Sequence, residues 1–229
     1  AAYCGAEHAV AVNSGTSALH IACLTLGLGP DDILWTTPNT FVASANCAYY
    51  CGARVDFVDI DPDTYNLSVD RLAEKLEIAD RVGRLPKVVI PVHFAGQSCD
   101  MQAISELGER YGFSIIEDAS HAIGGRYRGE AIGSCTFSDM TIFSFHPVKI
   151  ITTGEGGMVL TNNKRWHKQL GRLRSHGITR DSSQMVSPNQ GPWYYNQIEL
   201  GFNYRMTDIQ AALGLSQLAR IEGFVGRRN

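Results

Sequence analysis

The chain has 229 residues, of which 44% are hydrophobic, so it is long enough to bury a core in one domain, or in one large domain with an appendage. Charged residues make up 19% of the chain and the formal net charge is -3. This composition argues against a nucleic-acid partner, since such proteins carry a concentrated basic surplus. No stretch approaches the roughly 18 apolar residues that span a bilayer, and the start lacks the pattern of a secretory signal, so we expect a cytoplasmic protein with no membrane partner.

Apolar runs alternate with helical patterns along the chain, which is typical of proteins with parallel strands and covering helices. We predict strands at Ala9–Val12, Ile33–Thr36, Arg54–Val58, Val88–Val92, Ser114–Glu117, Met140–Phe145 and Gly157–Leu160. We predict helices at Ser17–Leu28, Ala43–Cys51, Val69–Leu76, Met101–Tyr111, Arg165–Arg174 and Met206–Glu222, and a polar loop at Asp181–Pro192. Continuous apolar strands such as KVVIPV predict an α/β three-layer domain with a mostly parallel central sheet.

A first candidate site lies between the first predicted strand and helix, where the sequence reads Asn13-Ser14-Gly15-Thr16-Ser17. Glycine allows close backbone approach, and a helix N-terminus offers unpaired N–H groups with a positive dipole end. The segment therefore suits an anion such as a phosphate. Ordinary capping of the helix by Ser or Thr is the alternative interpretation.

Two further candidates follow later strands. Asp118 comes directly after an apolar strand, and His121 follows it by three residues. An acid at a strand's carboxyl end is placed for a ligand, although helix capping would also explain it. Lys149 follows an aromatic strand and precedes a glycine-rich turn, where partial burial would lower the lysine pKa and favour a Schiff base with an aldehyde. A surface lysine is the alternative.

The six cysteines are interpreted as reduced core thiols without a chemical role. None forms a CxxC pair, and none has histidines at the spacing of a zinc site. Cys47 and Cys51 lie one helical turn apart in an apolar segment, as expected of small core residues. We expect neither disulfides nor a metal site.

Seven motifs carry a resemblance to a known family, and they cover nearly the whole chain. In order they read NSGTSALH, TPNTFVASAN, HFAG, EDASHAIGG, FSFHPVKIITTGEGG, RSHG and GFNYRMTDIQAALGLSQL. Together they resemble the DegT/DnrJ/EryC1/StrS family of sugar aminotransferases, most of all the branch that aminates UDP-linked 4-keto sugars in the pseudaminic acid pathway. The resemblance implies a homodimeric pyridoxal 5'-phosphate (PLP) enzyme of the aspartate-aminotransferase-like fold, called fold type I. Residues 1–229 would then be the PLP-binding major domain, truncated at both ends and without the C-terminal small domain.

The resemblance also implies roles for single residues around the PLP ring. Lys149 matches the lysine that holds PLP as a Schiff base and moves the proton. Asp118 matches the acid that pairs with the pyridine nitrogen, and His121 matches the residue at the ring's phenolic oxygen. Phe41 matches the aromatic residue that stacks on the ring.

The remaining implied contacts concern the PLP phosphate. They belong to Gly15, Thr16, Ser17 and Ser144, and to Asn203, which would reach the phosphate of the neighbouring subunit. An active site shared between two subunits would follow from this last contact. We interpret His93, His146, His176 and Arg205 as core or supporting residues, and Glu155 as shaping the turn after Lys149.

The implied reaction is a ping-pong transamination. Glutamate would donate its amino group to PLP, and a nucleotide-linked 4-keto-6-deoxy sugar would then accept it, with Lys149 moving the proton. A PLP-dependent sugar dehydratase is one alternative, although one group of such relatives replaces the lysine with histidine and Lys149 is present here. A PLP-binding regulatory relic without turnover is the other alternative.

Overall fold

The computed structural model describes residues 1–185 and 190–228 of the chain, and a seven-stranded sheet forms its centre. Residues 186–189 of the predicted loop lie outside this description. The strands of the sheet are β1 (His8–Val12), β2 (Ile33–Thr36), β3 (Arg54–Phe57), β4 (Val88–Ile90), β5 (Ser114–Asp118), β8 (Met140–Ser144) and β9 (Gly157–Thr161). Two short hairpins lie outside it, β6 (Arg126–Tyr127) with β7 (Glu130–Ala131), and β10 (Ile178–Thr179) with β11 (Asn196–Gln197).

The sheet is mostly parallel, as the sequence predicted. Its strand order is β1-β9-β8-β5-β4-β2-β3, and every neighbouring pair from β8 to β3 runs parallel. Strand β9 runs antiparallel to both β8 and β1. Strand β1 therefore points the same way as the parallel strands, and the carboxyl ends of β1, β2, β4, β5 and β8 lie at one edge of the sheet.

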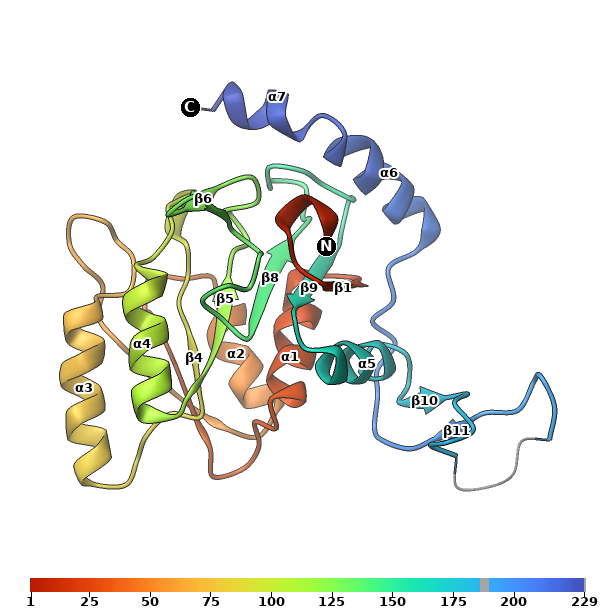
Figure 1. The fold of residues 1–229 in the computed structure, drawn as a ribbon, viewed down its shortest axis with the longest axis horizontal. Coiled ribbons are helices and arrows are strands. Elements are labelled where there is room, and N and C mark those ends of the chain that lie inside the picture. The colour runs from red at the N-terminus through yellow and green to blue at the C-terminus, as the bar shows by residue number, and fades with distance from the viewer. Residues whose placement is uncertain (186–189, 229) are drawn as a thin grey trace.

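Helices cover both faces of this sheet and make three layers (Figure 1). Helices α1 (Gly15–Thr25), α2 (Ala43–Tyr50) and α5 (Lys164–Leu173) pack on one face, and α3 (Val69–Arg81) and α4 (Met101–Tyr111) pack on the other. Successive strand residues alternate between the two cores, since Leu34 joins the first face and Trp35 the second. The predicted three-layer α/β fold is confirmed.

Several element boundaries differ from the predicted ones for local reasons. Strand β4 ends at Ile90 and not at Val92, because Pro91 has no N–H to continue the ladder. Helix α3 begins after Ser68, whose hydroxyl accepts from the Arg71 amide at 3.3 Å. It continues beyond Leu76 to Arg81, because Ala79 extends its buried stripe. Helix α1 starts at Gly15 and ends at Thr25, each two or three residues before the predicted limit.

The single helix predicted at Met206–Glu222 is wrong. The chain forms α6 (Asp208–Leu218) and α7 (Ile221–Gly226), with a break at residues 219–220. Helix α6 starts late because Thr207 and Gln210 form a capping box, in which the Thr207 hydroxyl accepts from the Gln210 amide at 3.3 Å.

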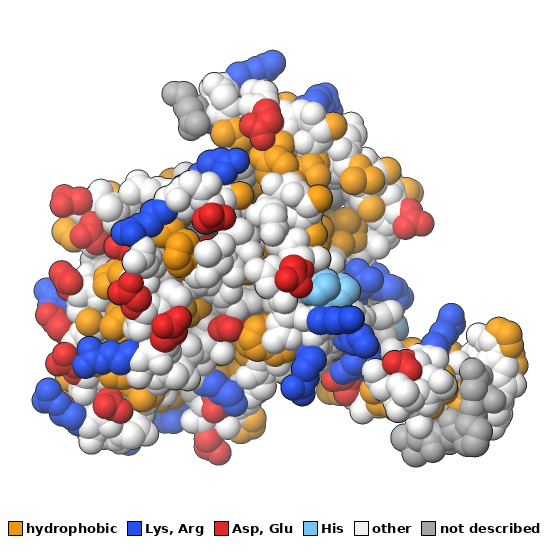
Figure 2. All heavy atoms as spheres, viewed as in Figure 1, with side chains coloured by type: hydrophobic (Ala, Val, Ile, Leu, Met, Phe, Trp, Pro, Cys, Tyr) orange, Lys and Arg blue, Asp and Glu red, His pale blue; other side chains and the backbone are white. Residues whose placement is uncertain are grey.

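Helix α6 presents apolar side chains to solvent, and Figure 2 shows hydrophobic atoms gathered on this side of the molecule. Ile209 is 85% exposed and Leu215 is 69% exposed. An exposed apolar helix face of this kind marks a surface for contact with another part of a protein. Among the described residues, no helix is long and apolar enough to cross a membrane.

Candidate active site

The carboxyl edge of the sheet brings together three segments that sequence analysis singled out. Asp118 ends β5, Ser144 ends β8, and the turn Asn13–Ser14 leads from β1 into α1 at Gly15. Strands β5 and β8 are hydrogen-bonded neighbours, with Asp118 opposite Ile142 in the register. In open parallel sheets ligands bind at this edge.

Gly15 and Ser144 lie against each other at the start of α1. A Cβ atom at Gly15 would stand 3.0 Å from Ser144 Cβ and 3.3 Å from its hydroxyl oxygen. In the described part of the chain, no hydrogen bond engages the backbone amides of Gly15 and Thr16. This arrangement forms an anion cradle. It consists of the two open amides, the Ser144 hydroxyl and the positive end of the 11-residue helix α1.

The hydroxyl of Ser17 is used inside the helix cap. It donates to Asn13 Oδ1 at 2.7 Å and lies 3.0 Å from Ser14 Oγ, which also accepts from the Ser17 amide at 3.0 Å. Both interpretations of this motif are thus compatible with the structure: Ser14 caps α1, and the amides of Gly15 and Thr16 stay open toward the edge of the sheet.

Asp118 is a buried carboxylate that neighbouring hydroxyls hold in place. Its side chain accepts from Ser44 Oγ at 2.6 Å and from Ser120 Oγ at 2.6 Å, and the residue is only 5% exposed. Ser44 Oγ lies 2.9 Å from Thr40 Oγ1, so the chain of hydroxyls continues to the segment before α2. These hydrogen bonds fix the position of the Asp118 carboxyl group at the end of β5.

Lys149 and His121 lie in the electrostatic field of this carboxylate. Partial burial lowers the pKa of Lys149, and the negative charge of Asp118 opposes that decrease. The pKa of His121 is also lowered, by burial and by the positive charge of Lys149, while Asp118 acts to raise it. A half-buried amine whose pKa lies below that of an ordinary lysine is suited to nucleophilic attack on an aldehyde.

Phe41 and Asn203 lie at the periphery of this group. Phe41 precedes α2, a few residues before Ser44, and is 73% exposed. The backbone carbonyl of Asn203 lies 3.5 Å from Asn13 Nδ2, and Asn203 is exposed. The stacking role of Phe41 and the role of Asn203 across a subunit interface stay predictions.

The structure places the secondary residues in different surroundings. His93 is fully buried, and its Nε2 lies 2.7 Å from Glu117 Oε2, which agrees with the predicted core role. His146 Nε2 lies 3.7 Å from Glu155 on the exposed turn before Lys149. The guanidinium of Arg205 donates to Ser175 Oγ at 3.1 Å. His176 has a positive φ of 62°, a backbone conformation that few non-glycine residues adopt.

Sequence reasoning missed the hydroxyls that fix Asp118. Ser44 lies 74 residues before Asp118, and a serine in a small-residue helix carries no local signal of such a contact. Ser120 could have been recognised, because an Asp followed two residues later by Ser often forms a local turn in which the carboxylate accepts from the backbone.

This set of donors fits PLP. An amine with a lowered pKa can bind the aldehyde, a buried carboxylate can face a protonated ring nitrogen, and the cradle at Gly15 and Ser144 can take the phosphate. Glycine at residue 15 permits this close approach, because an added Cβ would press on Ser144. Among the described residues, no group of three or more His, Cys, Asp or Glu side chains could hold a metal ion.

Comparison with known proteins identifies relatives along the whole chain. The sequence pattern of the DegT/DnrJ/EryC1/StrS aminotransferase family matches residues 1–229. A GDP-perosamine synthase of Caulobacter vibrioides is 44% identical over 226 residues, which are 99% of this chain and 56% of that protein. A UDP-4-amino-4,6-dideoxy-N-acetyl-beta-L-altrosamine transaminase of Campylobacter jejuni is 42% identical over 227 residues, again 99% and 56%.

A solved structure shows the same arrangement of elements. The PLP-form of a sugar aminotransferase from Streptococcus pneumoniae superposes with a TM-score of 0.82 at 30% identity, over 97% of this chain and 57% of that one. The fold is therefore the one found in PLP-dependent aminotransferases. The chain spans little more than half the length of the relatives that it matches.

Proposed function

Since the chain belongs to the DegT/DnrJ/EryC1/StrS aminotransferase family, we propose that it binds PLP through Lys149 and transfers an amino group from glutamate to a nucleotide-linked 4-keto-6-deoxy sugar. One observation carries the proposal: the Lys149 amine, the buried Asp118 carboxylate and the anion cradle of Gly15 and Ser144 belong to one edge of the sheet. A lysine, an acid and a phosphate site are the three groups that PLP chemistry requires of a protein.

Each residue then has a task that follows from its surroundings. When bound, PLP supplies an electron sink for the carbon that carries the amino group. Asp118, held by Ser44 and Ser120, keeps the proton on the ring nitrogen and so strengthens that sink. The open amides of Gly15 and Thr16 orient the cofactor through its phosphate.

Lys149 has two tasks, both at its Nζ atom. Its lowered pKa leaves more of the amine unprotonated at neutral pH than in an ordinary lysine, so that it can hold the cofactor covalently. Once the amino donor has displaced it, the same nitrogen takes a proton from one carbon and returns it to another. The pKa of His121 is also lowered, by burial and by the positive charge of Lys149.

The proposed class of amino-group acceptor is inferred from the names of the relatives. One relative's name refers to a GDP-linked sugar and the other's to a UDP-linked sugar, and the two are about equally similar to this chain. The common element is an amino sugar on a nucleotide. We therefore propose a nucleotide-linked keto-sugar as acceptor, with UDP preferred from the motif resemblance.

We further propose that the protein acts in the cytoplasm as a homodimer whose active site is shared. Asn203 is exposed next to Asn13, where a second subunit could receive its amide at the cofactor phosphate. The exposed apolar face of α6, with Ile209 and Leu215, supplies a surface that association would bury.

The test is an absorption spectrum of the purified protein after incubation with PLP. We expect a visible band of lysine-bound PLP that Lys149→Ala abolishes and that added glutamate bleaches. Lys168→Ala is the matched control, since Lys168 is an exposed lysine on α5, and it should leave the band unchanged. A band that survives Lys149→Ala would refute the assignment of the lysine.

The second half of the reaction is tested by adding a 4-keto-6-deoxy sugar nucleotide to the bleached protein. We expect the visible band to return in proportion to an amino sugar detected by mass spectrometry. A product that has lost oxygen without gaining nitrogen would instead identify a dehydratase, and the proposed transamination would be wrong.

A further inference from the structure

A buried pair of ionisable side chains, His93 and Glu117, lies next to Asp118 and has no task in the proposed reaction. His93 is fully buried and Glu117 is 5% exposed. The Nε2 atom of His93 lies 2.7 Å from Glu117 Oε2. The other carboxylate oxygen of Glu117 accepts from the hydroxyl of Ser138 and, at 3.1 Å, from that of Thr141. Both oxygens of this carboxylate are thus engaged inside the protein.

His93 also contacts the backbone of Asp118. Its amide donates to the Asp118 carbonyl at 3.1 Å, and the Asp118 amide donates to the Pro91 carbonyl at 2.9 Å. A bridge between Val92 and Asp118 continues the parallel pairing beyond the end of β4. The imidazole is fixed at its second nitrogen, since the Cys99 amide donates to Nδ1 at 3.2 Å. His93 therefore holds the end of β5 both through its backbone and through its side chain.

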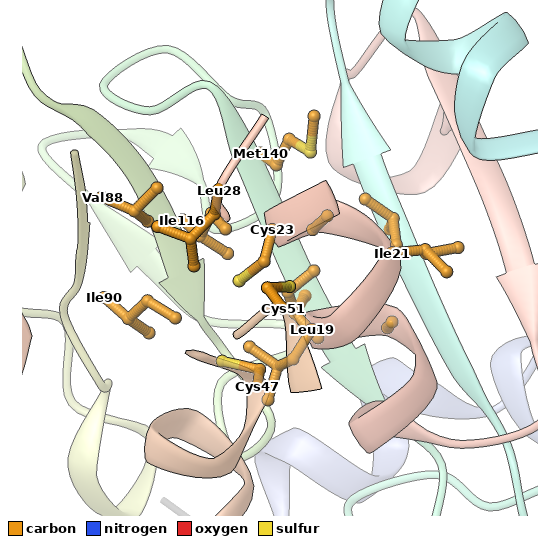
Figure 3. Close-up of a cluster of buried hydrophobic side chains, with 14 of the residues drawn as sticks. Leu19, Ile21, Cys23, Leu28, Cys47, Cys51, Val88, Ile90, Ile116 and Met140 are labelled. Carbon is orange, nitrogen blue, oxygen red and sulfur yellow. The ribbon is translucent and has the colours of Figure 1, made fainter. Parts of the chain in front are cut away.

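Glu117 and Asp118 point to opposite faces of the sheet. Ile116 belongs to the core packed against α1 and α2 (Figure 3), and successive residues of a strand alternate between its faces. Asp118 therefore shares the side of Ile116, where Ser44 of α2 donates to it at 2.6 Å. Glu117 meets His93 on the other side. Because one peptide plane joins Glu117 to Asp118, a bond that fixes the first side chain also limits rotation of the second.

The segment that begins with His93 also approaches the backbone of His121. Gly96 has a φ of 95°, and a Cβ atom at this position would stand 2.8 Å from the His121 carbonyl oxygen. Glycine adopts this conformation without strain and has no Cβ to prevent the approach. The HFAG motif, residues 93–96, therefore lies against the backbone of two residues of the candidate site, Asp118 and His121.

We propose that His93 is a positioning residue for Asp118, which it holds in the orientation that keeps the proton on the PLP ring nitrogen. The proposal rests on the proposed function, because that function gives Asp118 its task at the ring. His93 is fully buried, and its effect on the reaction passes through the Glu117 side chain and the Asp118 backbone.

Stability alone does not account for this pair. The cost of removing two ionisable groups from water can exceed the free energy of their attraction, so apolar side chains of similar volume would stabilise a core equally well. An apolar pair would lack direction, however, whereas hydrogen bonds hold their partners within a narrow range of distance and angle. The pair of His93 and Glu117 lies one residue from Asp118, a carboxylate whose direction matters for the ring nitrogen.

The first measurement uses the unmodified sequence and needs no PLP. Amide hydrogen exchange of the unloaded protein is followed by NMR. The Asp118 amide should exchange as slowly as the amides inside β5, although Asp118 is the last residue of that strand, because the Pro91 carbonyl accepts from it. Exchange as fast as that of an open strand end would overturn the proposal.

Two variants then divide the side-chain contacts of His93. His93→Asn keeps an acceptor for the Cys99 amide but is too short to reach Glu117, whereas His93→Gln keeps a donor that reaches Glu117. In His93→Asn, exchange of the Asp118 amide should accelerate at least about tenfold more than exchange of the amides in β9. In His93→Gln it should stay near the unmodified rate. Equal acceleration over the whole sheet in His93→Asn would give His93 a purely structural role and overturn the proposal.

Thr161→Val is the matched control for loss of a buried hydrogen bond. The Thr161 hydroxyl donates to the Asp139 carbonyl at 2.9 Å, and Thr161 pairs with His8 at the opposite edge of the sheet from Asp118. This variant should leave the exchange of the Asp118 amide unchanged relative to the rest of β5. A selective acceleration at Asp118 in the control would contradict the assignment to His93.

With PLP bound, the readout is the NMR chemical shift of the isotope-labelled ring nitrogen, which reports its protonation. His93→Asn should move this shift toward that of an unprotonated ring, whereas His93→Gln and Thr161→Val should not; an unchanged shift in His93→Asn would overturn the proposal. Asp118→Asn should remove the ring proton. If it leaves the shift unchanged, or if no PLP binds, the proposed function fails, and the amide exchange of Asp118 in the unloaded protein still decides whether His93 holds it.

Discussion

The substitution Gly15→Ala tests whether the contact between α1 and β8 forms the cofactor's phosphate site. Gly15 is the first residue of α1, and an added Cβ would stand 3.0 Å from the Cβ of Ser144 and 3.3 Å from its hydroxyl. Carbon contacts this short are resolved by a shift of a few tenths of an ångström. The Ser144 hydroxyl and the start of the helix must therefore move apart, which widens the cradle.

The effect on PLP binding can be bounded from the hydrogen bonds involved. A bond from an amide or hydroxyl to a charged group contributes about 1.5–3 kcal/mol. Loss of one such bond to the phosphate corresponds to roughly 10- to 150-fold weaker PLP binding, at ~1.4 kcal/mol for each factor of ten. The free energy of unfolding should change less than the free energy of PLP binding. The intrinsic preference of alanine over glycine in a helix, about 1 kcal/mol at most, offsets part of the strain.

The assay is a titration with PLP followed by absorbance, with urea unfolding measured on the same samples. Gly171→Ala is the matched control, because Gly171 lies within α5 and an added Cβ there would meet no atom within 4 Å. We expect the control to gain up to about 1 kcal/mol in unfolding free energy with unchanged PLP affinity. Unchanged PLP affinity in Gly15→Ala would refute the argument that this contact builds the phosphate site.

Two further predictions concern stability. Glu117→Gln should lower the free energy of unfolding in urea by about 3 kcal/mol, because Glu117 is a buried partner of His93; a loss below about 1 kcal/mol would contradict this. Ser14→Ala removes the N-cap of α1 and should cost about 1 kcal/mol in the same assay, and an unchanged midpoint would show that the cap contributes nothing.

Much of the candidate site could be predicted from short stretches of consecutive residues. Three features were recognised because each lies at or just after the end of an apolar strand, where ligands collect in parallel sheets: the acid that ends β5, the turn that leads into α1 at Gly15, and the lysine after β8. The roles within the site came from the resemblance of whole motifs, since a single lysine or aspartate has a plausible structural alternative.

Contacts between distant segments could not be predicted in this way. The bond from Ser44 to Asp118 and the pair of His93 with Glu117 depend on which strands and helices are neighbours, and this order is absent from the local pattern. The break between α6 and α7 was also missed, because the apolar residues of α6 face solvent and continue the helical pattern without packing.

The sequence alone determined the α/β class, the mostly parallel sheet and the segments that meet a ligand, because periodicity and turn chemistry act over a few neighbouring residues. Only the tertiary structure decided which of these groups touch. Burial lowers the pKa of Lys149 while the charge of Asp118 opposes that decrease, and the tertiary fold brings the Ser44 hydroxyl to 2.6 Å from the Asp118 carboxylate. Such properties arise when residues far apart in the chain share a space without water, where hydrogen bonds and charges act strongly.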